Sequence, residues 1–379
     1  MEKESDGDST VKSNNSMPVA PSSSSSSSRK LKREIEQNND ELSWDMLDII
    51  AKKLDIDNLF QFGAVSKSWR IFHKIYWKDF MASQAPLLVQ TSFAMNSYSL
   101  YNIREQKIVL NYCYLERFRY AGYSNGNITM VDVTNNKLLL INPFTRRIKE
   151  ISTLAIKGKF PFIGSNFLFA SVKDSKEFII MGIGNHYQSL HVYHSRNSSW
   201  VTYSSQDNSW MVVNCLVFRN IVYVITNKAR IGVLNLNSSS LKFLRLKNTP
   251  KVNNFHIKLV NHDGELLMVD FESQQQVDVY KIDFSTRAYV KLETVGELAI
   301  FYGWTSCYAL RKPVVWGYKN NFMYHLGGLH VGCEVYFEGK LFKSILATGL
   351  PPYAFISGIS WVDWCFRHQH DEVDYSIVE

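Results

Sequence analysis

The chain has 379 residues, of which 45% are hydrophobic, and a formal net charge of +7. This length and composition allow two domains with an ordinary globular core. Five cysteines without a C-x-x-C pair argue against a disulfide framework or a zinc finger, and they favour a reducing compartment.

The N-terminal part of the chain, residues 1–40, is polar and includes seven consecutive serines at 22–28. Because it has little to bury, we expect it to be disordered. Its basic cluster around Arg29–Arg33 is interpreted as a solvated linker, with a nuclear-import signal or a nucleic-acid patch as the alternative. No signal-peptide pattern and no apolar run of roughly 18 residues occurs, so we expect a cytoplasmic and/or nuclear protein that is not secreted and does not enter a membrane.

Residues 41–80 are expected to form three short helices. Leu47, Ile50, Ala51 and Leu54 follow the spacing i, i+3, i+4, i+7 of one helical face. Asp57 can cap a second helix, and the third is predicted from the same spacing in Val65, Trp69, Phe72 and Tyr76.

Apolar side chains in this segment exceed what one helical stripe can bury. On a wheel of about 100° per residue, Ile49 falls on the far face beside Asp45, Lys52 and Lys53. A unit of 40 residues is at the limit of independent stability. The surplus therefore indicates a partner that completes the core.

After Pro86 the helical spacing gives way to short alternating strands that are separated by turns. A turn–strand–turn–strand unit recurs, with its first turns at Asn125, Asp174, Asn220 and Asp263, in steps of 49, 46 and 43 residues. This is the period of a propeller blade, so residues 86–379 predict a β-propeller of about six blades. A β-sandwich is the alternative, but its turns would recur every 8–12 residues without a longer period.

No pattern of catalytic, cofactor-binding or metal-binding residues is found. Gly182 and Gly184 lack the third glycine of a nucleotide motif. His191 and His194 would point to opposite faces of a strand, which is poor geometry for one metal. We therefore expect no enzyme activity, no cofactor and no metal. The acidic segment 370–379 is interpreted as a solvated tail, with a partner contact as the alternative.

The stretch from Leu42 to Trp69 resembles an F-box, the helical module that docks on a Skp-type adaptor in cullin–RING ubiquitin ligases. "AVSKSWR" is similar to the family's V-C-x-x-W segment, with Ser66 where cysteine is common, and Ser43 occupies the usual place of proline. The expected adaptor-binding residues are Leu42, Leu47, Ile49, Ile50, Leu54, Leu59, Val65 and Trp69.

The remainder resembles the plant F-box-associated KIB-type β-propeller domain. "LLLINPFTRRIKEI" (138–151) is similar to its L-x-N-P-x-T blade edge, and "VGELAIFYGWTS" (295–306) to its G-D-x-A-L-F-L-G segment. Together the two resemblances cover roughly residues 42–340. They imply a mainly β chain with a small α module: a tail over 1–40, an F-box over 41–80 and a propeller over 86–379.

These resemblances imply a non-catalytic substrate-recognition subunit of an SCF-type (Skp–cullin–F-box) ubiquitin ligase, whose propeller binds an unidentified client protein. Candidate client-binding loops are Asn142–Arg147, Ser195–Trp200 and Asp283–Arg287. Two other functions stay open: a propeller scaffold that binds no adaptor, and a helix-turn-helix nucleic-acid binder. We do not expect nucleic acid, because aromatic residues dominate the third helix and basic residues in the repeats are diffuse.

Overall fold

The computed structural model describes residues 42–377 except 55, 93–96, 104, 114–117, 133, 157–165, 205–209, 253, 273–275, 327–331, 338–339, 347–358 and 368–370. The expected disordered tail over 1–40 lies outside the described residues. The chain divides into two compact units, Met1–Asp79 and Phe80–Glu379, which we call the helical unit and the propeller unit. No helix in the described ranges is both long and apolar enough to cross a membrane.

From residue 42 onward, the helical unit has three helices in the described part of the chain: α2 (Trp44–Ala51), α3 (Ile56–Phe62) and α4 (Lys67–Ser83), the last of which runs into the next unit. They lie near the three predicted positions. Their shared core consists of Leu47, Ala51, Leu59, Phe62 and Phe72, all buried. Aromatic contacts hold the core together, with ring centroids 4.9 Å apart for Trp44 and Phe72 and 4.4 Å apart for Phe62 and Trp69.

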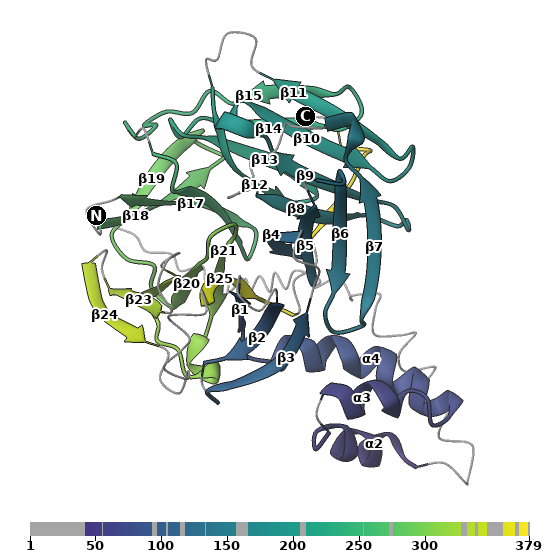
Figure 1. Ribbon diagram of the computed structural model, residues 1–379. Coiled ribbons are helices and arrows are strands. Elements are labelled where there is room, and N and C mark those ends of the chain that lie inside the picture. The colour runs from purple at the N-terminus through teal and green to yellow at the C-terminus, as the bar shows by residue number, and fades with distance from the viewer. Residues whose placement is uncertain are drawn as a thin grey trace, which may run out of the picture. The chain divides into compact units, whose positions relative to one another are not determined.

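The propeller unit consists of six antiparallel or mostly antiparallel sheets arranged as blades around an axis (Figure 1). This confirms the predicted β-propeller of about six blades and excludes the sandwich. From the axis outward the blades are β25-β1-β2-β3, β4-β5-β6-β7, β26-β8-β9-β10-β11, β12-β13-β14-β15, β16-β17-β18-β19 and β21-β20-β22-β23-β24.

The strands of blades 1 to 3 are β25 (Ile359–Cys365), β1 (Leu87–Ser92), β2 (Ser97–Asn102), β3 (Lys107–Cys113), β4 (Phe118–Ser124), β5 (Asn127–Asp132), β6 (Lys137–Asn142), β7 (Arg147–Ser152), β26 (Glu372–Val373), β8 (Phe167–Val172), β9 (Phe178–Ile183), β10 (Ser189–His194) and β11 (Ser199–Ser204). Those of blades 4 to 6 are β12 (Val212–Phe218), β13 (Ile221–Thr226), β14 (Ile231–Asn235), β15 (Ser240–Phe243), β16 (Ile257–His262), β17 (Glu265–Glu272), β18 (Gln276–Asp283), β19 (Ala288–Leu292), β20 (Leu298–Tyr302), β21 (Cys307–Arg311), β22 (Phe322–Leu326), β23 (Gly332–Phe337) and β24 (Lys340–Leu346).

The recurring turns of the sequence follow the first strand of each blade from the second to the fifth. Asn125 and Gly126 have φ of 49° and 71°, and Asp263 and Gly264 have φ of 45° and 78°. A two-residue hairpin of this type needs positive φ at both central residues, which Asn-Gly and Asp-Gly adopt at low cost. The steps of 49, 46 and 43 residues are therefore the spacing between successive blades.

Blade 1 is closed by strands from both ends of the propeller unit. β25 pairs antiparallel with β1, with Leu88 opposite Trp364 and Val89 opposite Asp363. Blade 1 thus has only three strands in sequence order, β1 to β3, which explains why the first copy of the repeat is faint. Pairing of late and early strands removes the open edge that would otherwise remain between the first and last blades.

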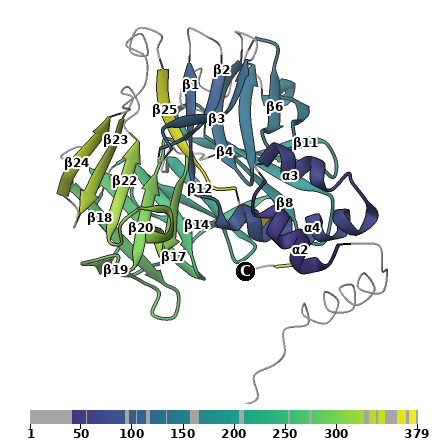
Figure 2. The same cartoon turned by 90° about the horizontal axis from the view of Figure 1, so that it is seen from below.

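Blade 6 departs from the simple meander. β21 lies nearer the axis than β20 (Figure 1). β22 pairs parallel with β20, and β23 and β24 continue outward (Figure 2). The short 3-10 helix η3 (Pro313–Trp316) makes the connection from β21 to β22. This changed strand order accounts for the loss of the repeat pattern after about residue 312.

The prediction of a solvated C-terminal tail is wrong for its described part, residues 371–377. β26 adds to the inner edge of blade 3 by pairing parallel with β8, and Val373 is fully buried. The segment packs because its main chain finds partners on β8 and because Val373 joins the core between blades 3 and 4. Because the segment is acidic, its composition gave no indication that Val373 would be buried.

Candidate functional site

The predicted adaptor-binding residues of the helical unit fall into three groups by their exposure. Leu47 and Leu59 are fully buried in its own core, so they cannot contact a partner directly. Leu42, Ile49 and Val65 are exposed, at 41%, 51% and 63%. The other three predicted residues, Ile50, Leu54 and Trp69, are half-buried.

An exposed apolar strip runs along α2. Met46, which is absent from the predicted set, is 47% exposed and lies three residues before Ile49 on the same side of the helix. Leu47 and Ala51 lie on the opposite, buried side. We call Leu42, Met46 and Ile49 the α2 strip. Ile75 of α4 is a further exposed aliphatic residue, and its i+3 spacing from the buried Phe72 gave no signal of that exposure.

A second surface is formed by turns at one end of the propeller sheets. In a four-stranded antiparallel meander, the turn after the first strand and the turn after the third lie at the same end. The loops Asn142–Arg147, Ser195–Trp200 and Asp283–Arg287 all join a third strand to a fourth, in blades 2, 3 and 5. They therefore lie at the same end of their blades as the turns at Asn125, Asp174 and Asp263. We call this end the turn face.

Side chains fix the shape of several of these loops. The Oδ1 of Asn142 accepts from the backbone N–H of Thr145 at 2.8 Å, and the Oδ1 of Asp283 accepts from the N–H of Ser285 at 2.9 Å. The same pattern recurs at Asn235 in blade 4. Such turns hold the exposed residues between them in one conformation, which reduces the entropy lost on binding.

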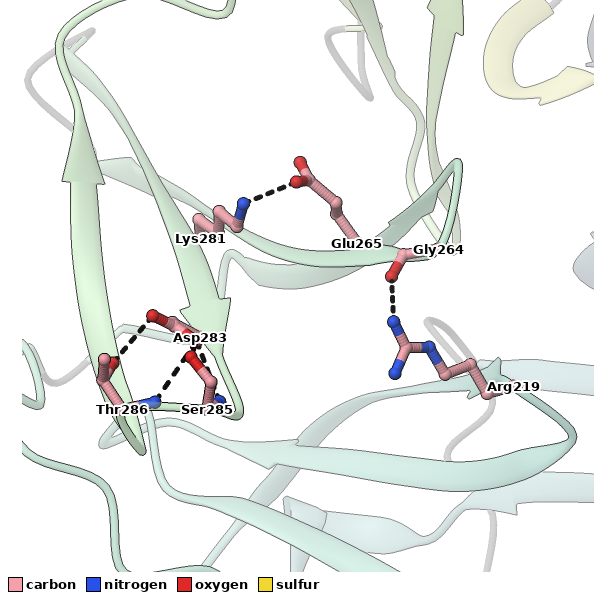
Figure 3. A network of polar contacts seen from close by, with 7 residues as sticks. All are labelled: Arg219, Gly264, Glu265, Lys281, Asp283, Ser285 and Thr286. Carbon is pink, nitrogen blue, oxygen red and sulfur yellow. Dashed lines mark hydrogen bonds and ion pairs between the residues drawn. The ribbon is translucent and has the colours of Figure 1, made fainter. Parts of the chain in front are cut away.

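Polar contacts also join neighbouring blades on the turn face (Figure 3). Arg219, in the first turn of blade 4, donates to the carbonyl of Gly264 in blade 5 at 2.8 Å. On blade 6, Arg311 pairs with Asp263 of blade 5 at 3.1 Å. In Figure 3 Lys281 also points toward Glu265 within blade 5. The first turns of blades 4 and 5 and the end of β21 in blade 6 are thus linked.

Next to this linkage the turn face contains a cavity of about 240 Å³ between blades 5 and 6. Its lining consists of Asn261, His262, Asp263, Tyr308, Ala309, Leu310, Arg311 and Phe366. Phe366 follows β25, so the cavity also borders the end of that strand.

A buried polar cluster lies at the axis. Asp363 of β25 is fully buried and accepts from the backbone N–H groups of Thr305 and Ser306 at 3.1 and 3.2 Å and from Tyr120 Oη at 2.8 Å. Gly303 leaves room for this carboxylate, since a Cβ there would lie 2.1 Å from Asp363 Oδ1. Burial raises the pKa of Asp363, and hydrogen bonds and Lys258 oppose that effect.

Lys258 of β16 belongs to the same cluster. Burial lowers the pKa of its amine to about 8, although the charge of Asp363 acts in the opposite direction, and its Nζ donates to the carbonyl of Trp304. Asn166 and Asn214 donate to the carbonyl of Thr305 at 3.1 and 3.4 Å. Residues from all six blades thus meet at the axis. Because these donors and acceptors form hydrogen bonds with one another, we interpret the cluster as a structural link between the blades.

Within the part of the chain that the structure describes, no group of three or more His, Cys, Asp or Glu residues could hold a metal. His191 is fully buried between Ser189 and Thr202, with ring contacts of 3.0 and 2.9 Å. His194 contacts Tyr375 Oη through Nδ1 at 2.7 Å. Both histidine rings thus contact neighbouring side chains.

The sheet topology defines the propeller unit as a six-bladed β-propeller. Residues 93–340 match the family model described as KIB1-4 beta-propeller, and the chain belongs to this family. The F-box protein At3g56470 of Arabidopsis thaliana is 22% identical over 268 residues, which cover 69% of this chain and 71% of that protein.

Two solved structures are similar to this chain at lower sequence identity. A quinonprotein alcohol dehydrogenase-like protein from Bacteroides thetaiotaomicron is 8% identical with a TM-score of 0.41, over 75% of this chain and 78% of that one. Virginiamycin B lyase from Staphylococcus aureus is 10% identical with a TM-score of 0.36, over 65% and 72%. At these scores neither likeness carries an argument about this chain.

Proposed function

We propose that the helical unit is an F-box and that the chain is the substrate-recognition subunit of an SCF-type ubiquitin ligase. The observation that carries the proposal is the α2 strip, a row of exposed apolar side chains on a unit whose own core is already filled by Leu47, Leu59 and Phe72. The KIB-type propeller and the relative named as an F-box protein support it. In this proposal the F-box occupies residues 41–80, and the propeller extends from residue 86 to the C-terminal segment.

The mechanism is one of positioning. The F-box would bury the α2 strip on a Skp-type adaptor, and the adaptor would connect the chain to a cullin–RING ligase. The propeller would hold a client protein near the ubiquitin-charged enzyme, so that ligation gains from a high effective concentration. The chain itself would form and break no bonds, and it would need no cofactor.

Replacement of Met46 and Ile49 by alanine tests the adaptor interface. The α2 strip is exposed, so a Met46→Ala/Ile49→Ala chain should keep its helices while its capture of the adaptor falls at least tenfold in a pull-down. Asp45→Ala/Lys53→Ala shortens two charged residues of the same segment and should leave capture unchanged. Leu47→Ala is not an equivalent test, because loss of a buried leucine costs about 2–5 kcal/mol and would unfold the small unit.

Full adaptor capture by a folded Met46→Ala/Ile49→Ala chain would contradict the F-box assignment and favour a propeller scaffold that binds no adaptor. The helix-turn-helix alternative predicts instead that the chain retains DNA through a high-salt wash. The observed third helix does not favour it, because Phe72 is buried in the core and Trp69 packs on Phe62.

We propose the turn face as the client-binding surface. The three candidate loops lie at this end of the sheets, each of them contains exposed residues, and side-chain hydrogen bonds fix two of them. Arg146→Glu/Arg287→Glu should weaken client capture while adaptor capture stays unchanged. Lys107→Glu makes one charge reversal of the same kind on β3 and serves as the control. Equal client capture by both variants would exclude these loops.

A further inference from the structure

The turn face already holds one peptide, the chain's own residues 371–377. We infer that the surface beneath this segment is a binding site for an extended acidic peptide that carries a tyrosine, and that the C-terminal segment occupies the site in cis. The identification of such a peptide as part of a client rests on the proposed function. The binding itself does not, since it requires no adaptor and no ligase.

The inner edge of blade 3 recognises the main chain of the segment. The backbone N–H of Ser171 donates to the carbonyl of Asp371 at 3.0 Å, and that of Lys173 donates to the carbonyl of Val373 at 2.9 Å. This is the pattern by which an extended peptide adds a strand to an open sheet edge. Any extended segment can make these two bonds.

Blades 2 and 4 contact the main chain on either side of this edge. Asn125 uses its side-chain amide both to donate to the carbonyl of Asp371, at 2.6 Å, and to accept from its backbone N–H. The backbone N–H of Asp374 donates to the carbonyl of Asn220 at 2.9 Å. Three consecutive blades therefore hold one short stretch of peptide.

Side chains on blade 3 distinguish acidic and aromatic residues. Lys173 Nζ pairs with the carboxylate of Asp374 at 3.4 Å. The guanidinium of Arg196 lies 4.9 Å from the ring centroid of Tyr375, and His194 Nδ1 contacts Tyr375 Oη at 2.7 Å. The surface thus offers a cation for a carboxylate and, at the next residue, a cation and a hydrogen-bond partner for a tyrosine.

These contacts are weak enough for a competing peptide to displace the C-terminal segment. The side chains of Lys173 and Arg196 are 47% and 60% exposed, and Arg196 also pairs with Glu177 at 3.1 Å. Exposed ion pairs contribute about 0–1 kcal/mol each. Of residues 371–377, only Asp371 and Val373 are buried. A client segment of similar chemistry could therefore displace the C-terminal segment.

A labelled synthetic peptide of residues 371–379 tests the site in trans. The full-length wild-type chain should bind it weakly, because its own segment competes. Val373→Ser/Tyr375→Ala weakens the resident segment and should strengthen peptide binding at least tenfold by fluorescence anisotropy. Adding Lys173→Glu/Arg196→Glu should abolish that gain, whereas adding Lys107→Glu should not. A scrambled peptide of the same composition should bind none of these chains.

A second measurement covers the case in which the Val373→Ser/Tyr375→Ala chain does not fold. Lys173→Glu/Arg196→Glu alone changes two exposed side chains, and it should release the resident segment. Hydrogen exchange at the amides of Ser171 and Asp374 should then be at least tenfold faster than in wild type. Unchanged exchange, or peptide binding that is indifferent to these two charges, would overturn the inference. Adaptor capture plays no part in either measurement.

Discussion

Two serines mark the places where the helical unit departs from the F-box pattern, and both are helix N-caps. Ser43 Oγ accepts from the backbone N–H of Met46 at 3.4 Å, and Ser66 Oγ accepts from that of Trp69 at 3.2 Å. A serine at this position satisfies a backbone donor that the first helical turn leaves free. The departures therefore support the local fold of α2 and α4.

Ser43 should accept proline better than alanine. Its φ is −59°, close to the value that a proline ring imposes. Ser43→Ala should destabilise α2 by about 1 kcal/mol through loss of the cap. Ser43→Pro loses the same cap but restricts the unfolded chain, which offsets about 0.4–1 kcal/mol. Hydrogen exchange of the α2 amides should thus rank wild type, proline and alanine in order of decreasing protection. Equal exchange in the two variants would show that the cap, not the backbone angle, decides.

Asp371 predicts a pH dependence of stability. Burial raises the pKa of its carboxyl from 3.8 to about 7. Between these values the folded chain binds a proton that the unfolded chain does not, so this group's contribution is fully present below about pH 4 and is lost as the pH rises through 7. The slope reaches about 1.4 kcal/mol per pH unit. Asp371→Asn should therefore raise the urea midpoint relative to wild type at pH 8 and much less at pH 4.5. A difference that is independent of pH would mean that this carboxyl does not titrate with folding.

Turns are the elements that could be predicted most directly from the sequence. The Asn-Gly and Asp-Gly pairs at 125–126 and 263–264 predicted both the hairpins and the blade spacing, since few other residues accept positive φ at two successive positions. β25 and β26 were not predicted as propeller strands. Their partners, β1 and β8, lie far away in sequence, and a pattern of period 2 does not say which edge a strand will join.

The helical face was predictable only in part. The i, i+3, i+4 spacing found Leu47 and Ala51, but it could not tell a side chain that fills the unit's own core from one that meets a partner. Ile49 was assigned correctly to the opposite face because charged neighbours surround it on the wheel. The distinction depends on how α3 and α4 cover α2, which is a tertiary property.

The turn at Asn142 allows an element-level test. Its Oδ1 accepts from the N–H of Phe144 at 3.1 Å and from that of Thr145 at 2.8 Å. Asn142→Ala leaves both donors without this acceptor and should lower the free energy of unfolding by about 1–2 kcal/mol. Asn142→Asp should be nearly neutral, because Asp283 makes the same contacts in blade 5. Urea denaturation distinguishes the two. An equal loss of stability in Asn142→Asp and Asn142→Ala would mean that the effect does not come from the hydrogen-bond acceptor.

At the scale of the whole propeller, closure depends on Asp363. Asp363 lies on β25, and its carboxylate accepts hydrogen bonds from Tyr120 of blade 2 and from Thr305 and Ser306 of blade 6. Asp363→Ala would leave those donors without their acceptor and the buried Lys258 without a nearby opposite charge, at a cost of about 3–5 kcal/mol. Urea denaturation should show this loss. As the control, Glu265→Ala removes an exposed ion pair with Lys281 and should cost less than about 1 kcal/mol. Similar losses in the two variants would mean that the axial cluster does not tie the ring.

The pairing of β25 with β1 also sets an order of events during synthesis. A ribosome adds about 5–20 residues per second, so β1 waits about 15 to 55 seconds for the roughly 270 residues that end with β25. Throughout that interval the helical unit has already emerged while the ring is open. A chain that a premature stop codon ends before residue 359 would keep the helices and never gain a closed ring. Under the proposed function, such a fragment would occupy the adaptor without delivering a client, so even one truncated allele would interfere with the intact protein.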